Sequence, residues 1–199
     1  MEFSLPTLLE GRLLERPEWD QYFLAIAKVV STRSTCSSRP VGCVVVRENR
    51  ILVTGYNGAP PGERHCTDQS REGGIHCARR AQNVPDSLKH DVCRSLHAEE
   101  NAVRLALRLG LDPLLAGASV YTTLSPCVRC IGLMREHGVA KVFFELAYES
   151  VDQDRDRRWR ELAESSFEVY RQIGLSGPSS RKIAGAVVGV TSERLLPSF

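Results

Sequence analysis

The sequence has neither a long hydrophobic run nor a strong excess of charge of one sign. Its longest nearly apolar stretch, residues 183–190, falls far short of the roughly 20 residues that a membrane-spanning helix needs. The 26 Lys and Arg residues nearly balance the 24 Asp and Glu residues, giving a formal net charge of +2. Bulk electrostatics therefore do not favour a membrane or nucleic-acid partner. A chain of 199 residues, 42% of them hydrophobic, is long enough to bury one continuous core.

The N-terminal residues also lack the basic segment followed by an apolar segment that marks a secretory signal. We therefore expect a cytoplasmic protein whose cysteines stay reduced. The chain has seven cysteines, an odd number, and several are spaced as metal ligands. This pattern favours metal sites over a disulfide framework.

Hydrophobic periodicity predicts strands that alternate with helices, which is typical of a sheet covered on both faces. We expect a three-layer α/β/α fold with a mixed central sheet of about five strands. Residues 1–175 are predicted to form a single domain with an insertion at 56–95 that shows no sustained periodicity, and residues 176–199 a linker and tail. The predicted elements are a helix over 17–31, a hairpin of strands over 41–46 and 51–55, a helix over 97–109, a strand over 119–124, a helix over 127–137, a strand over 141–146, a charged helix after residue 152 and a strand over 167–171.

Two short motifs stand at the starts of predicted helices on either side of the strand over 119–124. The first is His97-Ala98-Glu99, and the second is a Pro-Cys-x-x-Cys motif that contains Cys127 and Cys130. One imidazole and two thiolates supply three zinc ligands and leave the fourth tetrahedral position for water, as in a catalytic zinc site. Glu99 is spaced to reach that water and to transfer its proton. This combination is the signature of zinc-dependent nucleobase deaminases.

Four segments give the chain a more specific resemblance. They are residues 16–23 (RPEWDQYF), 55–60 (GYNGAP), 97–102 (HAEENA) and 121–127 (YTTLSPC). With them the chain resembles the deoxycytidylate (dCMP) deaminases of the cytidine-deaminase-like superfamily, over a region from about Arg16 to Glu149. The resemblance implies the cytidine-deaminase-like fold and hydrolysis of dCMP to dUMP and ammonia, which supplies dUMP for thymidylate synthesis.

The resemblance also implies roles for individual residues. His97, Cys127 and Cys130 become ligands of a catalytic zinc, and Glu99 becomes the proton shuttle. Further candidates for substrate contacts are Asn57 at the deoxyribose, Ser125 near the exocyclic amine and Tyr148 near the phosphate. Some members of the family respond to dCTP and dTTP, for which the candidate effector-binding residues are Gly55, Asn57, Gly58 and Arg108. A homo-oligomer, in many relatives a hexamer, is also expected.

The other five cysteines divide into one predicted core residue and four predicted ligands. Cys43 lies inside a valine-rich strand and is expected to be a buried free thiol. The four predicted ligands of a second, structural zinc are Cys36, Cys66, Cys77 and Cys93, with His65, His76 or His90 as substitutes for one of them. Such a zinc would explain how the insertion is ordered, and the resemblance agrees, because many dCMP deaminases carry a second zinc in this loop.

Several alternatives remain open at this point. The same chemistry would also fit dCTP, a modified deoxycytidylate or a base in RNA as substrate. A non-catalytic zinc-binding module and a redox protein that uses Cys127 and Cys130 are the rivals outside this enzyme class. The basic residues around Trp159 are balanced by acidic neighbours, which predicts a solvated helix face.

Overall fold

The computed structural model of the chain describes residues 16–70, 77–85, 92–149 and 152–175. A five-stranded mixed sheet forms its centre, in the spatial order β2-β1-β3-β4-β5. Strand β1 is antiparallel to both β2 and β3, whereas β3, β4 and β5 run parallel. The strands are β1 (Gly42–Arg47), β2 (Arg50–Tyr56), β3 (Ser119–Leu124), β4 (Lys141–Leu146) and β5 (Val169–Gln172).

A tight turn joins β1 and β2 and confirms the predicted hairpin. Glu48 and Asn49 occupy the turn with φ values of 50° and 58°. Two consecutive positive φ angles are what a type I′ turn requires, and this turn matches the right-handed twist of the strands. Beyond the turn, β1 is buried along almost its whole length, as its unbroken valines predict.

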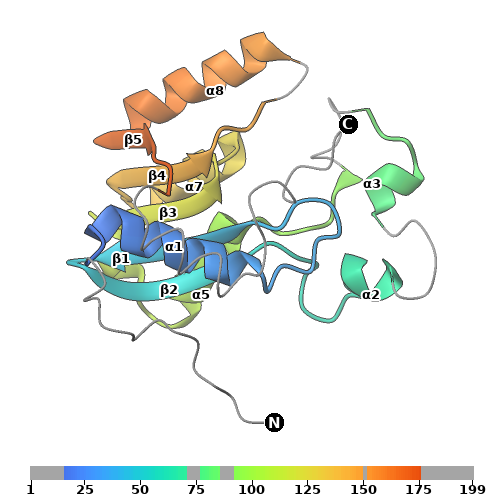
Figure 1. The fold of residues 1–199 in the computed structure, drawn as a ribbon, viewed down its shortest axis with the longest axis horizontal. Coiled ribbons are helices and arrows are strands. Elements are labelled where there is room, and N and C mark those ends of the chain that lie inside the picture. The colour runs from blue at the N-terminus through green and yellow to red at the C-terminus, as the bar shows by residue number, and fades with distance from the viewer. Residues whose placement is uncertain (1–15, 71–76, 86–91, 150–151, 176–199) are drawn as a thin grey trace, which may run out of the picture.

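Helices cover both faces of the sheet, so the predicted three-layer fold is confirmed (Figure 1). On one face lies α1 (Trp19–Ser31), whose Phe23 and Ala27 pack on Val44 and Tyr121. The larger core lies on the opposite face, where α5 (Ala98–Arg108), α6 (Asp112–Leu115), α7 (Val128–Glu136) and α8 (Gln153–Ser166) gather. None of the helices in the described ranges is both long and apolar enough to cross a membrane.

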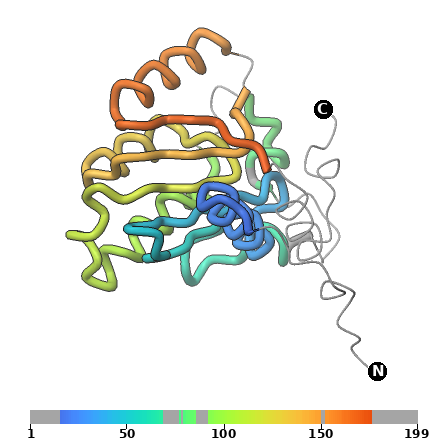
Figure 2. The backbone as a smooth tube through the Cα atoms, turned by 60° about the vertical axis from the view of Figure 1, so that its left-hand side comes forward, coloured from blue at the N-terminus to red at the C-terminus, as the bar shows by residue number. Residues whose placement is uncertain are grey.

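Two parallel strands determine where a ligand site can form. After β3 and β4 the chain turns away at the same edge of the sheet, and α7 begins there, directly after β3. Crevices beyond the carboxyl ends of parallel strands are the usual ligand sites in such sheets. The short helices α2 (Cys66–Ser70) and α3 (Ala78–Ala81) lie beside this end of the sheet, in the predicted insertion (Figures 1 and 2). Periodicity did not predict α2, α3 or α6 because five residues or fewer are too short to establish a helical period.

Candidate active site

Three metal-ligating side chains meet at the starts of α5 and α7. His97 is the N-cap residue of α5 and Cys127 is the N-cap residue of α7, while Cys130 lies in the first turn of α7. The Sγ atoms of Cys127 and Cys130 lie 3.4 Å and 3.5 Å from His97 Nδ1, and the two sulfurs are 3.7 Å apart. In the part of the chain that the structure describes, these three are the His, Cys, Asp or Glu side chains that cluster closely enough to share one metal ion.

The three distances fit zinc. With Zn–S bonds of about 2.3 Å and Zn–N bonds of about 2.05 Å, a tetrahedral ion separates two sulfurs by about 3.8 Å and a sulfur from a nitrogen by about 3.6 Å. The observed separations of 3.7, 3.4 and 3.5 Å match the edges of that tetrahedron. The side chains can therefore hold zinc with little rearrangement, and three protein ligands leave a fourth position open, as catalytic sites do.

Electrostatics in the metal-free cluster also favour a cation. Hydrogen bonding from Cys130 lowers the pKa of Cys127 to about 3, while the same interaction and burial raise the pKa of Cys130. Burial lowers the pKa of His97, but hydrogen bonding and charge from Cys127 outweigh it and raise that pKa overall. A thiolate next to partly buried nitrogen and sulfur ligands, at the positive ends of two helices, is an environment for a soft divalent metal.

Glu99 lies two residues after His97, in the first turn of α5, and only 4% of its surface is exposed. Burial raises its pKa, and the charge of His97 opposes the shift. The hydroxyl of Thr122, on β3, lies 3.3 Å from Glu99 Oε1. A carboxyl group with a raised pKa beside a metal site suits proton transfer.

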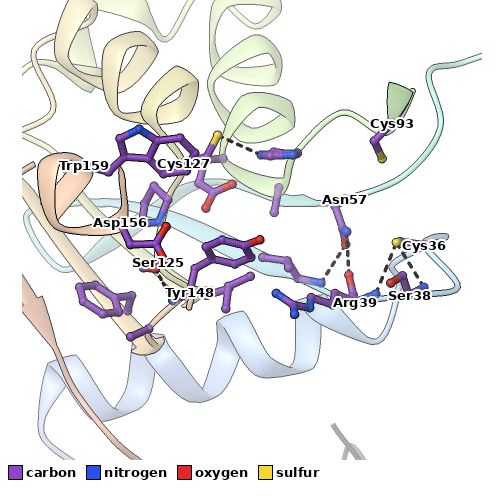
Figure 3. Close-up of a pocket in the computed structure, with 18 of the residues that line it drawn as sticks. Cys36, Ser38, Arg39, Asn57, Cys93, Ser125, Cys127, Tyr148, Asp156 and Trp159 are labelled. Carbon is purple, nitrogen blue, oxygen red and sulfur yellow. Dashed lines mark hydrogen bonds between the residues drawn. The ribbon is translucent and has the colours of Figure 1, made fainter. Parts of the chain in front are cut away.

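A single cavity contains these groups and extends to either side of them (Figure 3). His97, Glu99 and Cys127 line its middle, and α8 contributes Asp156 and Trp159. The prediction of a solvated face around Trp159 is therefore wrong for Trp159 itself, which is half-buried against the cavity, although Arg157 and Arg158 are exposed. Local charge balance did not reveal this, because the contact depends on how α8 packs against α7 and β5.

Sequence reasoning also missed Arg39, on the loop before β1. Arg39 lines the cavity, and its guanidinium carbon lies 5.1 Å from the centre of the Tyr148 ring. Figure 3 shows Arg39 and Ser38 at the opposite side of the cavity from Trp159 and Asp156. No motif signals this role, because an arginine in a loop has many surface functions.

The three predicted substrate contacts all line the cavity, and two of them are held by the protein itself. Asn57 Oδ1 accepts hydrogen bonds from Val41 N at 2.8 Å and from Ser34 Oγ at 2.6 Å, and its Nδ2 donates to Arg39 O at 2.8 Å. Asn57 thus fastens the loop that carries Arg39.

Ser125 performs a similar task after β3. Its Oγ accepts a hydrogen bond of 2.7 Å from the backbone N–H of Tyr148 and also interacts with the side chain of Tyr170. The Ser125 hydroxyl therefore positions the residue that follows β4, and Tyr148 is the predicted contact whose ring faces the cavity (Figure 3).

The candidate effector residues other than Asn57 lie outside this cavity. A Cβ atom on Gly55 would come within 2.2 Å of Ala98 O, and one on Gly58 within 2.2 Å of Thr35 Oγ1. Close packing thus gives a reason for both glycines that involves no ligand. Arg108 is exposed at the far end of α5, about 16 Å along the helix axis from His97, so a nucleotide contact by Arg108 stays a prediction.

The four predicted ligands of a second zinc gather around the insertion. The charges of Cys36 and Cys77 contribute to a raised pKa of Cys66, for which burial is the largest cause. Cys36, Cys77 and Cys93 all line the cavity described above. Within the described ranges, however, no three of the four cysteines approach one another as closely as the three side chains of the first cluster do.

The proposed substitutes for these ligands are placed only in part. His65 precedes Cys66, and its buried Nδ1 has no hydrogen-bond partner among the described residues. His76 and His90 lie outside the described residues, as does the predicted tail at 176–199. Cys43 is fully buried and free, as predicted.

Comparisons with known proteins agree with this geometry. The deoxycytidylate deaminase of Saccharomyces cerevisiae is 36% identical over 163 residues, which cover 82% of this chain and 45% of that protein. The enzyme of Schizosaccharomyces pombe is 38% identical over 67% of this chain and 38% of that protein, so this chain spans less than half the length of either fungal relative. The deoxycytidylate deaminase of Mycobacterium phage D29 is 37% identical over 66% of this chain and 97% of that protein.

Solved structures and a family comparison complete the assignment. The crystal structure of the dCMP deaminase from cyanophage S-TIM5 in complex with dCMP and dUMP has a TM-score of 0.55 and 25% identity, over 80% of this chain and 99% of that one. Residues 17–146 match the cytidine and deoxycytidylate deaminase zinc-binding region. That match includes His97, Glu99, Cys127 and Cys130, and the chain therefore belongs to the cytidine and deoxycytidylate deaminase family.

Proposed function

We propose that the protein is a zinc-dependent hydrolase that converts dCMP and water into dUMP and ammonia. The observation that carries the proposal is the arrangement of His97, Cys127 and Cys130 at the edge lengths of a zinc tetrahedron, with the buried carboxyl group of Glu99 in the same cavity. Relatives named deoxycytidylate deaminase support dCMP as the substrate.

In this proposal His97, Cys127 and Cys130 hold the zinc ion. When bound, zinc supplies Lewis-acid activation of a water molecule for attack on C4 of the pyrimidine. Glu99 accepts a proton from the attacking water and delivers it to the departing amine. Burial raises the pKa of the Glu99 carboxyl group, which favours its role as a proton carrier.

The charges along the cavity support one orientation of the nucleotide. With the base at Glu99, the deoxyribose lies toward Asn57, and the phosphate lies toward Arg39, whose backbone carbonyl is hydrogen-bonded to Asn57. Arginine suits a phosphate because its planar guanidinium group donates two parallel hydrogen bonds. On the opposite side of the cavity, α8 contributes both the carboxylate of Asp156 and the guanidinium group of Arg160, whose charges offset each other.

The test of this proposal is a deamination assay on zinc-loaded protein with dCMP, dCTP and cytidine as separate substrates. We expect dUMP formation from dCMP, and a loss of about 100-fold or more in kcat in Glu99→Gln, because general acid–base catalysis contributes about 10²–10⁴-fold. Zinc content measured on the same sample should remain unchanged in that variant. Turnover of cytidine alone, or full activity in Glu99→Gln, would contradict the proposal.

We further propose that Cys36, Cys66, Cys77 and Cys93, with His65 as a substitute ligand, bind a second zinc that orders the insertion. The charges of Cys36 and Cys77 act on Cys66 and contribute to its raised pKa, which supports this. Cys36 Sγ also accepts hydrogen bonds from two backbone N–H groups, those of Ser38 at 3.4 Å and Arg39 at 3.5 Å.

Elemental analysis of purified protein tests the second site. We expect two zinc ions per chain in the wild type and one in a Cys66→Ser/Cys93→Ser variant. A value of one in both proteins would contradict the second site without affecting the first.

Three finer features remain part of the proposal. The expected dCTP and dTTP response and the expected homo-oligomer rest on the family resemblance, and the oligomer is the arrangement in which Arg108 would reach a nucleotide. Light scattering at several protein concentrations tests the assembly. The cytoplasmic location is supported by seven free cysteines, which are typical of a reducing compartment.

A further inference from the structure

Thr122 is a buried polar residue on a face of β3 that is otherwise apolar. Side chains alternate along a strand, so Thr122 shares its face with Val120 and Leu124, which both pack in the larger core. Thr122 itself is fully buried, with 0% of its surface exposed. Valine has nearly the same shape, suits a strand equally well and brings no polar group into a core. The hydroxyl group of Thr122 therefore calls for an explanation.

This hydroxyl group has two neighbours that can accept its hydrogen. Thr122 Oγ1 lies 3.3 Å from Glu99 Oε1 and 3.1 Å from the backbone oxygen of Leu124. A hydroxyl group has one hydrogen to donate and two lone pairs with which to accept. It can therefore donate to a charged carboxylate at Glu99. It can equally donate to Leu124 O and accept a hydrogen bond from a carboxyl group at Glu99 that carries a proton.

Other groups around the Glu99 carboxylate do not replace this contact. The backbone N–H of Glu99 donates to its own carboxylate, and the charge of His97 acts on it. Cys43 is the partner of Thr122 across β1 and β3, and the charge of Glu99 contributes to the raised pKa of its buried thiol. A thiol is only a weak donor. Thr122 thus supplies the stronger hydrogen bond that reaches Glu99 from the sheet.

We propose that Thr122 is a positioning residue, whose hydroxyl group holds the Glu99 carboxyl group in place with and without its proton. This inference rests on the proposed function, in which Glu99 takes a proton from the attacking water and passes it to the departing amine. The hydroxyl group donates to the carboxylate before that proton arrives. It turns to Leu124 O, and accepts from the carboxyl group, while Glu99 carries the proton.

The place of Thr122 explains why it acts through Glu99. Thr122 is not among the residues that line the active-site cavity, whereas Glu99 is. A rotation of one hydroxyl group then accompanies each proton transfer, and the carboxyl group itself keeps its position. That constancy matters because a displacement of about 1 Å in a catalytic group can reduce the rate by about 100-fold.

The test measures kcat and KM for dCMP in zinc-loaded Thr122→Val and Thr122→Ser. We expect kcat to fall at least about tenfold in Thr122→Val, which is the usual contribution of a hydrogen bond to a charged group. KM should stay within about twofold, because Thr122 does not touch the substrate. Thr122→Ser keeps the hydroxyl group and should have a kcat within about threefold of the wild type. Thr122→Ala also removes the hydroxyl group, so it keeps the proposal testable even if Thr122→Val does not fold.

A second measurement separates positioning from a general structural role. Two residues that act as a unit have non-additive effects. In Glu99→Gln, the further change Thr122→Val should alter the remaining rate by less than about twofold, because the group that Thr122 positions is already lost. A merely structural role would lower the rate in both backgrounds.

Thr123→Val is the matched control. Thr123 is the next residue on β3 and is also buried, at 5% exposure, but its side chain lies on the opposite face of the sheet. There its Oγ1 accepts a hydrogen bond of 3.2 Å from Gly42 N. We expect kcat within about twofold of the wild type in this variant, with the zinc content of all variants unchanged.

The possible outcomes separate the two proposals. A wild type that does not deaminate dCMP would contradict the proposed function, and this inference with it. In a wild type that deaminates dCMP, full kcat in Thr122→Val or an equal loss in Thr122→Val and Thr122→Ser would overturn the positioning role alone. An equal loss in Thr123→Val, or the full further loss in the Glu99→Gln background, would overturn it too.

Discussion

Replacing Gly55 with alanine would test how the sheet positions α5, the helix that carries Glu99. Gly55 lies in β2 directly beneath the first turn of α5, the turn that carries Glu99. An added Cβ would lie 2.2 Å from Ala98 O and 2.6 Å from Ala102 N. Both atoms are backbone atoms, so they can move only if α5 itself moves.

The size of the effect follows from that contact. Because real Cβ atoms essentially never come within 3.0 Å of such neighbours, the start of α5 must withdraw from Gly55 by at least the difference between 3.0 and 2.2 Å. Overpacking of this kind costs about 1–3 kcal/mol, which lowers Tm by about 3–10 °C in a chain of this size. A displacement of about 1 Å in a catalytic group can reduce the rate by about 100-fold.

Thermal unfolding followed by circular dichroism, together with kcat for dCMP, measures both effects in Gly55→Ala. Gly132→Ala is the control, since Gly132 lies inside α7 with no atom within 4 Å of the added Cβ, and alanine there should stabilise the helix by up to about 1 kcal/mol. If Gly55→Ala kept the wild-type Tm and kcat and altered only the response to dCTP or dTTP, the packing explanation would be refuted. Gly55 would then be an effector residue.

Three further predictions test other parts of the structure. Lys28 Nζ lies 2.6 Å from Glu145 Oε2, and only 9% and 13% of the two side chains are exposed. Lys28→Met should therefore destabilise the protein by about 3 kcal/mol in urea unfolding, because it leaves a largely desolvated carboxylate unpaired. The double change Lys28→Met/Glu145→Leu should recover most of that loss, and no recovery would contradict a dominant desolvation cost. Asn57→Ala should lower the free energy of unfolding by about 2–3 kcal/mol, since it removes three hydrogen bonds of a buried side chain. It should also raise KM for dCMP more than it lowers kcat, because the loop that carries Arg39 loosens. An unchanged KM would argue against that loop as the phosphate site. Trp159→Ala should lower kcat/KM for dCMP by about tenfold through loss of an aromatic cavity wall, whereas Trp159→Phe should stay within about twofold of the wild type. Equal activity in Trp159→Ala would show that the Trp159 ring does not contact the substrate.

Much of the fold could be predicted because its elements carry strong local signals. Strands β3 and β4 match the predicted ranges, and the predicted helices over 97–109 and 127–137 end at glycines with positive φ, Gly110 and Gly138. The insertion could not be predicted in the same way. Its short helices α2 and α3 provide too few residues for a periodic pattern.

The sequence by itself indicated the candidate metal ligands His97, Cys127 and Cys130 and the candidate proton-transfer group Glu99, because their spacing places them at the starts of two helices. Such spacing is a local property, since backbone geometry relates residues a few positions apart. Only the tertiary structure decided which distant side chains complete the cavity. Arg39 and Trp159 reach it from a loop and a helix 120 positions apart in the sequence, and the ion pair of Lys28 and Glu145 forms only because α1 packs beside β4. Contacts of that kind depend on packing over the whole sheet, which no short segment encodes.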